Sequence, residues 1–173
     1  ASFGCVSSPM DSSFNTRDRT KTWKDVTIEE IAQETADKYG LKLKYSGAEI
    51  RIAVIEQSQK TDSAFLYDLC DAYGLSVKAY KKSIVVYSQS EMEEKKPVKK
   101  LKRADFVDDS WQYADALTGV YTGARISYKP GGGSEEISVY VGEKDEEAKD
   151  SRVLFLNEAA DSISDAYRKA AAA

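Results

Sequence analysis

The sequence contains no histidine in its 173 residues. Without imidazole, the chain cannot build a Ser-His or Cys-His nucleophilic pair, and it cannot hold a metal ion through histidine ligands. Acid–base or metal-dependent chemistry would have to rely on carboxylates, tyrosines or lysines alone. The histidine-dependent classes of enzyme are therefore excluded within this chain.

Cysteine is scarce as well. The two cysteines, Cys5 and Cys70, are too few for a disulfide framework, and neither belongs to a CxxC pair that would indicate zinc or redox chemistry. Cys70 falls on the apolar side of a predicted helix, so we expect a buried thiol. This cysteine usage is compatible with a reducing cytoplasm.

Long apolar runs are also absent. No stretch approaches the ~20 apolar residues of a membrane-spanning helix, and residues 1–10 lack the basic and apolar regions of a secretory signal. The formal net charge of −4 argues against a dedicated nucleic-acid binder, which usually carries a basic excess. We therefore expect neither membrane insertion nor a nucleic-acid partner. The chain begins with Ala1 and stops inside an apparent helix, which indicates a fragment of a longer polypeptide.

The residues that are present predict an α+β fold. Hydrophobic residues at 42% and charged residues at 31% are ordinary for a globular protein. At Thr27 a capping box with Glu30 begins a helix, and Gly40 supplies its left-handed stop. Apolar residues then alternate with polar ones at 41–45 and at 50–54, which predicts two strands.

The same order of elements recurs 34 residues later. Thr61 caps a second helix, Gly74 ends it, and strands follow at 75–79 and 84–86. The match predicts a duplicated helix–strand–strand (αββ) unit whose two helices share one core. The residues that a shift of 34 superimposes without a gap are Thr27, Tyr39, Gly40, Leu41, Leu43, Ile50 and Ile52 on Thr61, Tyr73, Gly74, Leu75, Val77, Ile84 and Val86.

Composition divides the chain into four regions. Residues 1–22 are polar and aperiodic, and predict an extended lead-in with a short strand near Phe3–Val6. Residues 23–90 hold the duplicated αββ domain. Residues 91–103, EMEEKKPVKKLKR, are dense in charge and are predicted to be a solvated linker rather than a nucleic-acid contact, because aromatic residues are missing. Residues 104–173 form a second α+β domain, resembling part of a β-barrel.

This second domain is predicted to be a small, mainly antiparallel β region with a C-terminal helix. Its expected elements are a short helix around Trp111 capped by Asp108 or Ser110, strands at 120–129 and 137–141 joined by a turn at Pro130–Ser134, a strand at 153–156, and a helix starting at Ser162 or Ser164.

Two groups of residues suggest ligand binding. Asp108, Asp109 and Asp115 could bind a hard cation, but EF-hand spacing is absent, and helix capping explains aspartates at this place. Gly131–Ser134 lacks the GxxxxGK[ST] pattern of a phosphate loop and has no helix after it, so a hairpin turn is favoured. We predict no metal site and no cofactor.

Two carboxylate pairs suggest glycosidase chemistry. Glu29 with Glu30, and Asp68 with Asp71, are each explained more simply by a helix cap or a solvated helix face, and two carboxylates alone are a weak signal. No catalytic constellation remains, and we predict that the protein is not an enzyme.

Eleven tyrosines and two tryptophans suggest protein contacts, because these side chains suit surfaces that are both apolar and able to hydrogen-bond. The alternative is that they complete small cores. We expect this for Tyr39 and Tyr73, which occupy equivalent helix ends. It is also the simpler interpretation for Trp23 and Tyr128, whereas Tyr113, Tyr121 and Tyr140 stay open.

Several motifs in order resemble the phage late control D family over about residues 20–173. The stretch Gln57–Leu66 resembles that family's "Q…S/T-D…FL" segment. The motifs that carry the resemblance are Lys21-Thr22-Trp23 with Val26-Thr27, Ile31-Ala32…Tyr39-Gly40-Leu41, Gln57–Leu66, Leu69-Cys70…Gly74, Val153–Leu156, and Ser162…Asp165-Ala166…Ala170.

The resemblance implies a structural subunit of a tail baseplate hub in a phage or prophage virion, assembled in the bacterial cytoplasm. Such subunits form trimeric rings and contact tube, spike and other hub subunits, and the family has no catalytic residues. The strands that would complete the hub's barrel sheets are partly absent from this chain. The resemblance therefore does not imply that this chain forms a trimer by itself. The repeat also resembles the short N-terminal domains of secretins and TonB-dependent receptors, a periplasmic alternative. A tail carbohydrate hydrolase is a third, disfavoured class.

Overall fold

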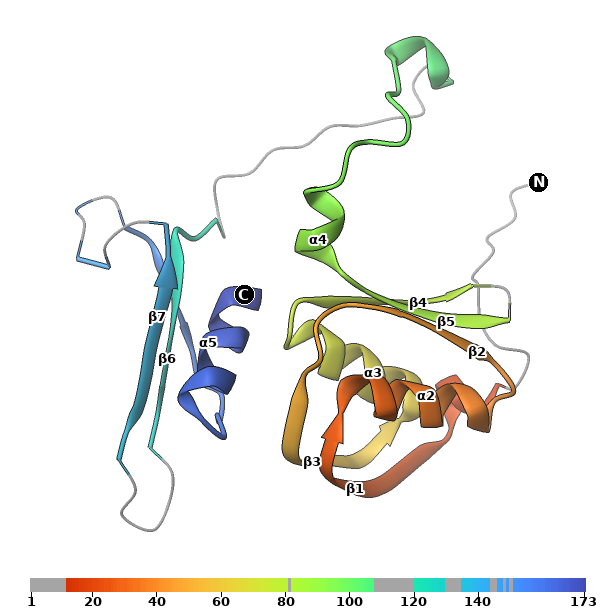
Figure 1. Cartoon of the computed structure of the whole chain (residues 1–173), viewed down its shortest axis with the longest axis horizontal. Coiled ribbons are helices and arrows are strands. Elements are labelled where there is room, and N and C mark those ends of the chain that lie inside the picture. The colour runs from red at the N-terminus through yellow and green to blue at the C-terminus, as the bar shows by residue number, and fades with distance from the viewer. Residues whose placement is uncertain are drawn as a thin grey trace. The chain divides into compact units, whose positions relative to one another are not determined.

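The chain forms two compact units in the computed structural model, residues 1–92 with 171–173 and residues 93–170 (Figure 1). The residues that the structure describes are 12–80, 82–107, 120–129, 135–143, 146–147, 149 and 151–173. The predicted strand near Phe3–Val6, the helix around Trp111 and the turn at 130–134 lie outside them.

The first unit contains the two helices and four strands that its sequence pattern predicts, and it adds α1, β1 and α4, which the pattern does not predict. The described elements in chain order are α1 (Ser13–Thr16), β1 (Asp18–Thr27), α2 (Ile28–Lys38), β2 (Lys42–Ser46), β3 (Arg51–Thr61), α3 (Asp62–Asp71), β4 (Leu75–Tyr80), β5 (Ser83–Ser88) and α4 (Gln89–Glu93).

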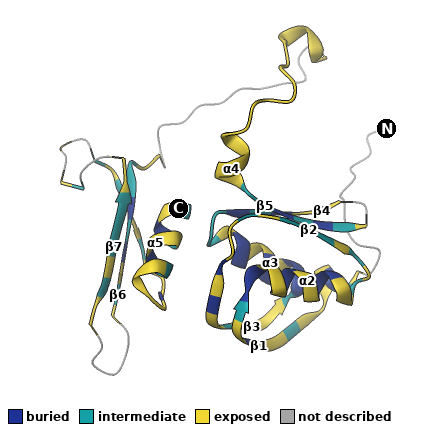
Figure 2. Cartoon of the chain, viewed as in Figure 1, coloured by how far each residue is buried: buried dark blue, intermediate teal, exposed yellow. Residues whose placement is uncertain are grey.

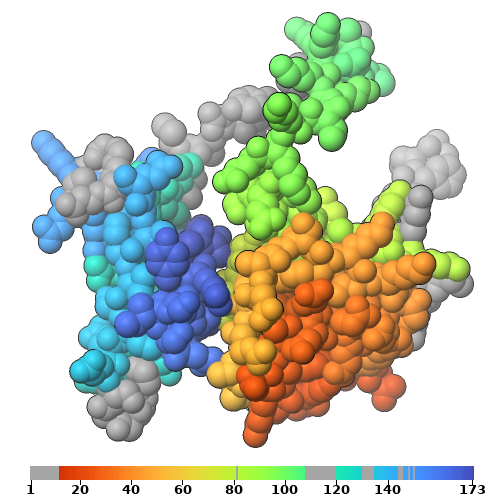
Figure 3. All heavy atoms as spheres, in the orientation of Figure 1, coloured from red at the N-terminus to blue at the C-terminus, as the bar shows by residue number. Residues whose placement is uncertain are grey.

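Two small sheets sandwich the helices of this unit. β1 and β3 pair antiparallel, and a three-stranded sheet has the order β2-β5-β4, with β5 parallel to β2 and antiparallel to β4. Helices α2 and α3 contact both sheets, and their buried sides face the strands (Figure 2). Figure 3 shows the atoms of β1, α2 and β3 lying against one another on the visible face of this unit.

The core of the first unit is a single apolar cluster drawn from both repeats. Ile28, Ile31, Leu66, Ile84 and Val86 are completely buried in it. Each such side chain stabilises the fold by about 1.5–3 kcal/mol relative to an exposed one. One shared interior therefore holds both predicted helices.

Local signals set the ends of the two helices. Thr27 accepts a hydrogen bond from the Glu30 amide, and the Glu30 carboxylate accepts one from the Thr27 amide, so the predicted capping box is present. Thr61 caps α3 by accepting from the Ala64 amide. Gly40 and Gly74 end the helices with φ of +62° and +67°, a region that favours glycine.

The order helix, strand, strand recurs as the sequence predicts, although the two copies pair differently. In the second copy β4 and β5 form a hairpin, whereas in the first copy β2 and β3 lie in separate sheets. The two copies also resemble each other in the strand directly before each helix. β1 ends at Thr27, where α2 begins, and β3 ends at Thr61, where α3 begins. The α+β prediction is confirmed.

A local two-fold relation links the two copies through the β1–β3 pair. Thr22 lies opposite Glu56, and these positions differ by the repeat length of 34. The flanking pairs Lys21–Gln57 and Trp23–Ile55 exchange under the same shift. Asp25 and Gln59, also 34 apart, both have φ of +47°. Around residues 21–23 and 55–57 the register is that of a local two-fold axis through the Thr22–Glu56 pair, and the pairing then shifts between Arg19 and Lys21.

The second unit is a three-stranded sheet with one helix. Its order is β7-β6-β8, with β7 antiparallel and β8 parallel to β6, and the C-terminal helix is present as predicted. Its small core contains Ala124, Ile126, Ala160, Ala166 and Ala170. The described elements are η1 (Arg103–Asp105), β6 (Gly123–Tyr128), β7 (Ile137–Gly142), β8 (Val153–Leu156) and α5 (Ile163–Ala172).

The segment between α4 and η1 has neither helix nor strand, and residues 94–102 are all exposed. Its apolar Val98 is fully exposed, so nothing in the described chain buries it. Among the described residues, no helix is both long and apolar enough to cross a bilayer.

Candidate functional site

A buried carboxylate forms the most unusual polar site in the described part of the chain. Asp62 is the first residue of α3, directly after the Thr61 cap, and its side chain is only 6% exposed. A helix N-terminus stabilises a negative charge at this position. The local sequence therefore places an anion at the start of the helix, and the fold then buries it.

Four side chains from three elements donate hydrogen bonds to Asp62, and we call them together the Asp62 cluster. The donors, with their distances to the carboxylate, are Lys38 Nζ at 2.6 Å and Tyr39 Oη at 2.6 Å from the end of α2, Gln57 Nε2 at 2.8 Å from β3, and Arg19 Nε at 3.1 Å from β1.

The cluster holds Asp62 in its ionised form. Burial by itself would raise the pKa of Asp62, but the hydrogen bonds from Lys38, Tyr39 and Gln57 outweigh burial and leave the pKa below its ordinary value. The pKa of Tyr39 is raised, first by burial and then by its hydrogen bond to the carboxylate. A carboxylate that is ionised and saturated with donors is a poor general base, so the geometry indicates a structural or binding role.

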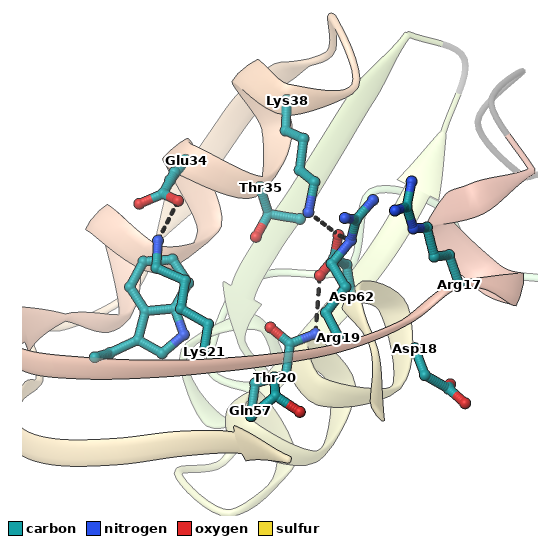
Figure 4. A pocket seen from close by; sticks show the side chains of 11 residues that line it. Arg17, Asp18, Arg19, Thr20, Lys21, Glu34, Thr35, Lys38, Gln57 and Asp62 are labelled. Atoms are coloured by element: carbon teal, nitrogen blue, oxygen red, sulfur yellow. Dashed lines mark hydrogen bonds and ion pairs between the residues drawn. The ribbon is translucent and has the colours of Figure 1, made fainter. Parts of the chain in front are cut away.

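A cleft of about 450 Å³ lies beside the cluster (Figure 4). Lys21 pairs with Glu34 on its wall, and the Lys21 ammonium lies 3.5 Å from the centre of the Trp23 ring. The indole Nε1 of Trp23 is buried and has no hydrogen-bond acceptor among the described residues. Figure 4 shows Arg17, Arg19 and Lys38 pointing toward one side of the cleft. Cations outnumber carboxylates along the lining.

The repeat places uncharged residues at the positions equivalent to the charged members of the Asp62 cluster. Asp62 corresponds to Ile28, which is completely buried, and Gln57 corresponds to Trp23. One copy thus has uncharged residues at the positions where the other copy carries a charge network. The full set equivalent to Asp62, Gln57, Arg19, Lys38 and Tyr39 is Ile28, Trp23, Ala53, Ala72 and Tyr73.

The carboxylates weighed in the sequence do not assemble into a site in the described residues. Glu29 and Glu30 lie in the first turn of α2, where Glu30 completes the cap. Asp68 pairs with Lys60 at 2.6 Å on the exposed side of α3, and Asp71 ends that helix. No group of three metal-ligating side chains occurs among the described residues.

The remaining candidates lie where the structure cannot test them or in the cores. Asp108, Asp109, Asp115, Tyr113, Cys5 and Gly131–Ser134 fall outside the described residues. Tyr39, Tyr73 and Trp23 belong to the first core or pack against it, and Tyr128 packs against the second. Cys70 is buried as expected, and burial raises the pKa of its thiol to about 12. Tyr121 is half exposed and Tyr140 is partly buried.

Sequence reasoning did not identify the Asp62 cluster as a site. Asp62 appeared only as one letter of the Gln57–Leu66 motif, and its charge looked like an ordinary first-turn residue of a helix. One signal was available: the repeat aligns Asp62 with Ile28, so a charge stands where the first copy has a core residue.

Comparison with known proteins gives two informative likenesses, while no family model matches the chain. Over 114 residues, 64% of this chain, the sequence is 32% identical to a protein of Escherichia phage 186 described as "Probable baseplate hub protein". The chain spans 29% of the length of that relative.

Comparison with solved structures shows which fold the chain shares. A 43 kDa tail protein of prophage MuSo2 from Shewanella oneidensis superimposes on 92% of this chain and 49% of its own length, with a TM-score of 0.52 and 16% identity. A type VI secretion component of E. coli gives a TM-score of 0.37 over 46% of this chain and 26% of its own length, with 12% identity. The chain therefore shares the fold of a phage tail protein.

Proposed function

We propose that this chain is part of a structural subunit of a bacteriophage or prophage tail baseplate hub. The observation that carries the proposal is the 32% identity, over 114 residues, to a protein described as a baseplate hub protein. The fold shared with the tail protein of prophage MuSo2 over 92% of the chain supports it independently.

At a finer level, we place the subunit in the late control D family. Its motifs occur in order on elements of matching type: Thr27 and Thr61 cap helices, Gly40 and Gly74 end them, and Val153–Leu156 is a strand. In this proposal the subunit contacts tube, spike and other hub subunits in the virion tail, and the full-length protein assembles as a trimer.

The proposed role is non-enzymatic. The chain offers no histidine, and the buried carboxylate that could serve as an acid or base is held ionised by four donors. Such a network suits a component that transmits load or fixes a contact. A cell-wall lysis assay with the purified full-length protein should show no clearing, and clearing would contradict this part of the proposal.

The experiment that tests the hub role uses the phage or prophage that encodes the chain. Disrupting the gene should give particles that lack a completed tail, and a plasmid copy should restore them. Immunogold labelling should place the protein at the tail tip. Normal tails without the protein would refute the role, and recovery of the protein from the periplasm would favour the secretin-like alternative.

A further inference from the structure

The three-stranded sheet of the first unit has one face turned away from helices α2 and α3. Residues of β2, β5 and β4 alternate, so Leu43, Ile84 and Val77 point to the core, while the residues between them point the other way. Helices α2 and α3 pack on the core side. We call the opposite face the outer face; the short helix α4 follows β5 at its end, where Gln89 accepts a hydrogen bond from the Ser76 hydroxyl at 3.4 Å.

Three lysines lie on this outer face. Lys44 and Lys78 lie opposite Val85 on either side of the central strand β5, and Lys42 lies two residues before Lys44. All three lysines are exposed. The remaining outer residues are Ser46, Ser76, Tyr80, Ser83, Val85 and Tyr87, so the face carries no carboxylate among the described residues.

The lysines of the outer face, Lys42, Lys44 and Lys78, make no salt bridge with a described carboxylate. Other cations of the unit are paired with carboxylates, among them Lys21, Lys38, Lys60, Arg19 and Arg51. Lys78 lines a hollow at the β4 edge together with Asp68 and Asp71, and Asp68 is already bound to Lys60.

Lys44 and Lys78 lie on β2 and β4 with β5 between them, so they share one face without being direct cross-strand neighbours. Together with Lys42 they make the face positive, and a surface of opposite charge would complement it, because such complementarity steers association and fixes register. We propose that the outer face docks an acidic surface of a neighbouring tail protein through Lys42, Lys44 and Lys78.

Nucleic acid is the less suitable occupant. Binding of single strands uses exposed aromatic rings on which bases stack. The Tyr87 ring is partly buried, and the Lys78 ammonium lies 5.8 Å from its centre, which leaves Tyr80 as the exposed ring among the described residues of this face. The hydroxyl-bearing residues and Val85 between the lysines instead suit a protein contact, which mixes polar and apolar area.

The inference rests on the proposed hub role, and one experiment separates the two. Lysines are acetylated in purified tails and in the free full-length protein, and each site is quantified by mass spectrometry. Protection of Lys42, Lys44 and Lys78 by about tenfold in tails is expected, as for a site about nine-tenths occupied. The exposed Lys96, Lys99 and Lys100 serve as the internal control and should react equally in both samples.

Zero-length carbodiimide coupling in the same tails identifies the occupant. Bonds from these three lysines to aspartates or glutamates of one other tail protein support the proposal. Bonds only to a second copy or to the same polypeptide overturn it, as does protection that nuclease treatment removes. Unprotected lysines in tails that contain the protein also overturn it, whereas absence of the protein from tails defeats the hub role itself.

Charge reversal supplies the matched control. The variant K42E/K44E/K78E should lower incorporation into tails at least about tenfold, a loss of ~1.4 kcal/mol in binding. The variant K96E/K99E/K100E changes the net charge equally and should incorporate normally. K42R/K44R/K78R should retain incorporation, and unchanged thermal unfolding of all three variants shows that the fold is intact. Equal loss in both reversals would mean that overall charge alone matters, and would overturn the docking face.

Discussion

Removing the buried carboxylate should destabilise the first unit substantially. In Asp62→Ala the Tyr39 hydroxyl and Gln57 amide lose a charged acceptor, and each hydrogen bond to a charged group is worth about 1.5–3 kcal/mol. Arg19 and Lys38 recover part of this loss because their side chains, 26% and 37% exposed, can return to water. We expect the free energy of unfolding to fall by about 2–4 kcal/mol.

The uncharged copy of the repeat provides the matched comparison. The variant R19A/K38A/D62I copies the residues that occupy the two-fold related positions, among them the buried Ile28. The packed isoleucine and the removal of both cations offset part of the lost network, while Gln57 and Tyr39 still lack the carboxylate acceptor, so this variant should be destabilised less than Asp62→Ala.

The parent also differs from both variants in its dependence on pH, because neither variant contains the Asp62 carboxylate. The folded-state pKa of Asp62 is lowered, so the unfolded chain binds the proton more tightly. The contribution of the carboxylate is fully present above its unfolded pKa of about 4 and is lost as the pH falls through the lower folded-state pKa. The parent should therefore lose its advantage over Asp62→Ala below about pH 4.

Urea titrations followed by circular dichroism at neutral and acidic pH measure both effects. A loss below about 1 kcal/mol in Asp62→Ala would mean that the network is solvated and contributes little. A loss in R19A/K38A/D62I as large as that of the single variant would refute the view that the fold tolerates an apolar set at these positions.

Leu66→Ala should cost about 2–5 kcal/mol, because Leu66 is completely buried between the helices; a loss below about 1 in the same titration would contradict this packing. Gly40→Ala should cost about 1–2 kcal/mol from backbone strain at φ +62°, since nothing within 4 Å blocks an added Cβ. The melting temperature of the Gly40→Ala variant tests this prediction, and an unchanged melting temperature would refute the backbone strain. Trypsin should cut first within residues 95–103, which are exposed and without helix or strand, as mass spectrometry of early fragments can show; a first cut within 42–88 would refute the linker.

The elements of the first unit could be predicted because their signals are local. The Thr27 and Thr61 caps and the Gly40 and Gly74 stops each act within a few residues, and the structure places all four at helix ends. Strand pairing is not local. Periodicity could not show that β3 leaves its own repeat to join β1, because the partner of a strand is decided by contacts between distant residues.

The Asp62 cluster was missed for the same reason. Its members come from four places in the sequence, between Arg19 and Asp62, and each looks like an ordinary surface residue by itself. Only the fold brings them to within hydrogen-bonding distance. The function, in contrast, was suggested by the order of short motifs, which the sequence carries directly.

The antiparallel pairing of β1 with β3 joins the two repeats into one cooperative unit. Each copy supplies a strand that the other must pair with, so neither segment, 18–46 or 51–80, has a complete set of partners when expressed alone. A single copy would expose the edge of that strand and would satisfy it most readily by pairing with another identical copy about the same axis.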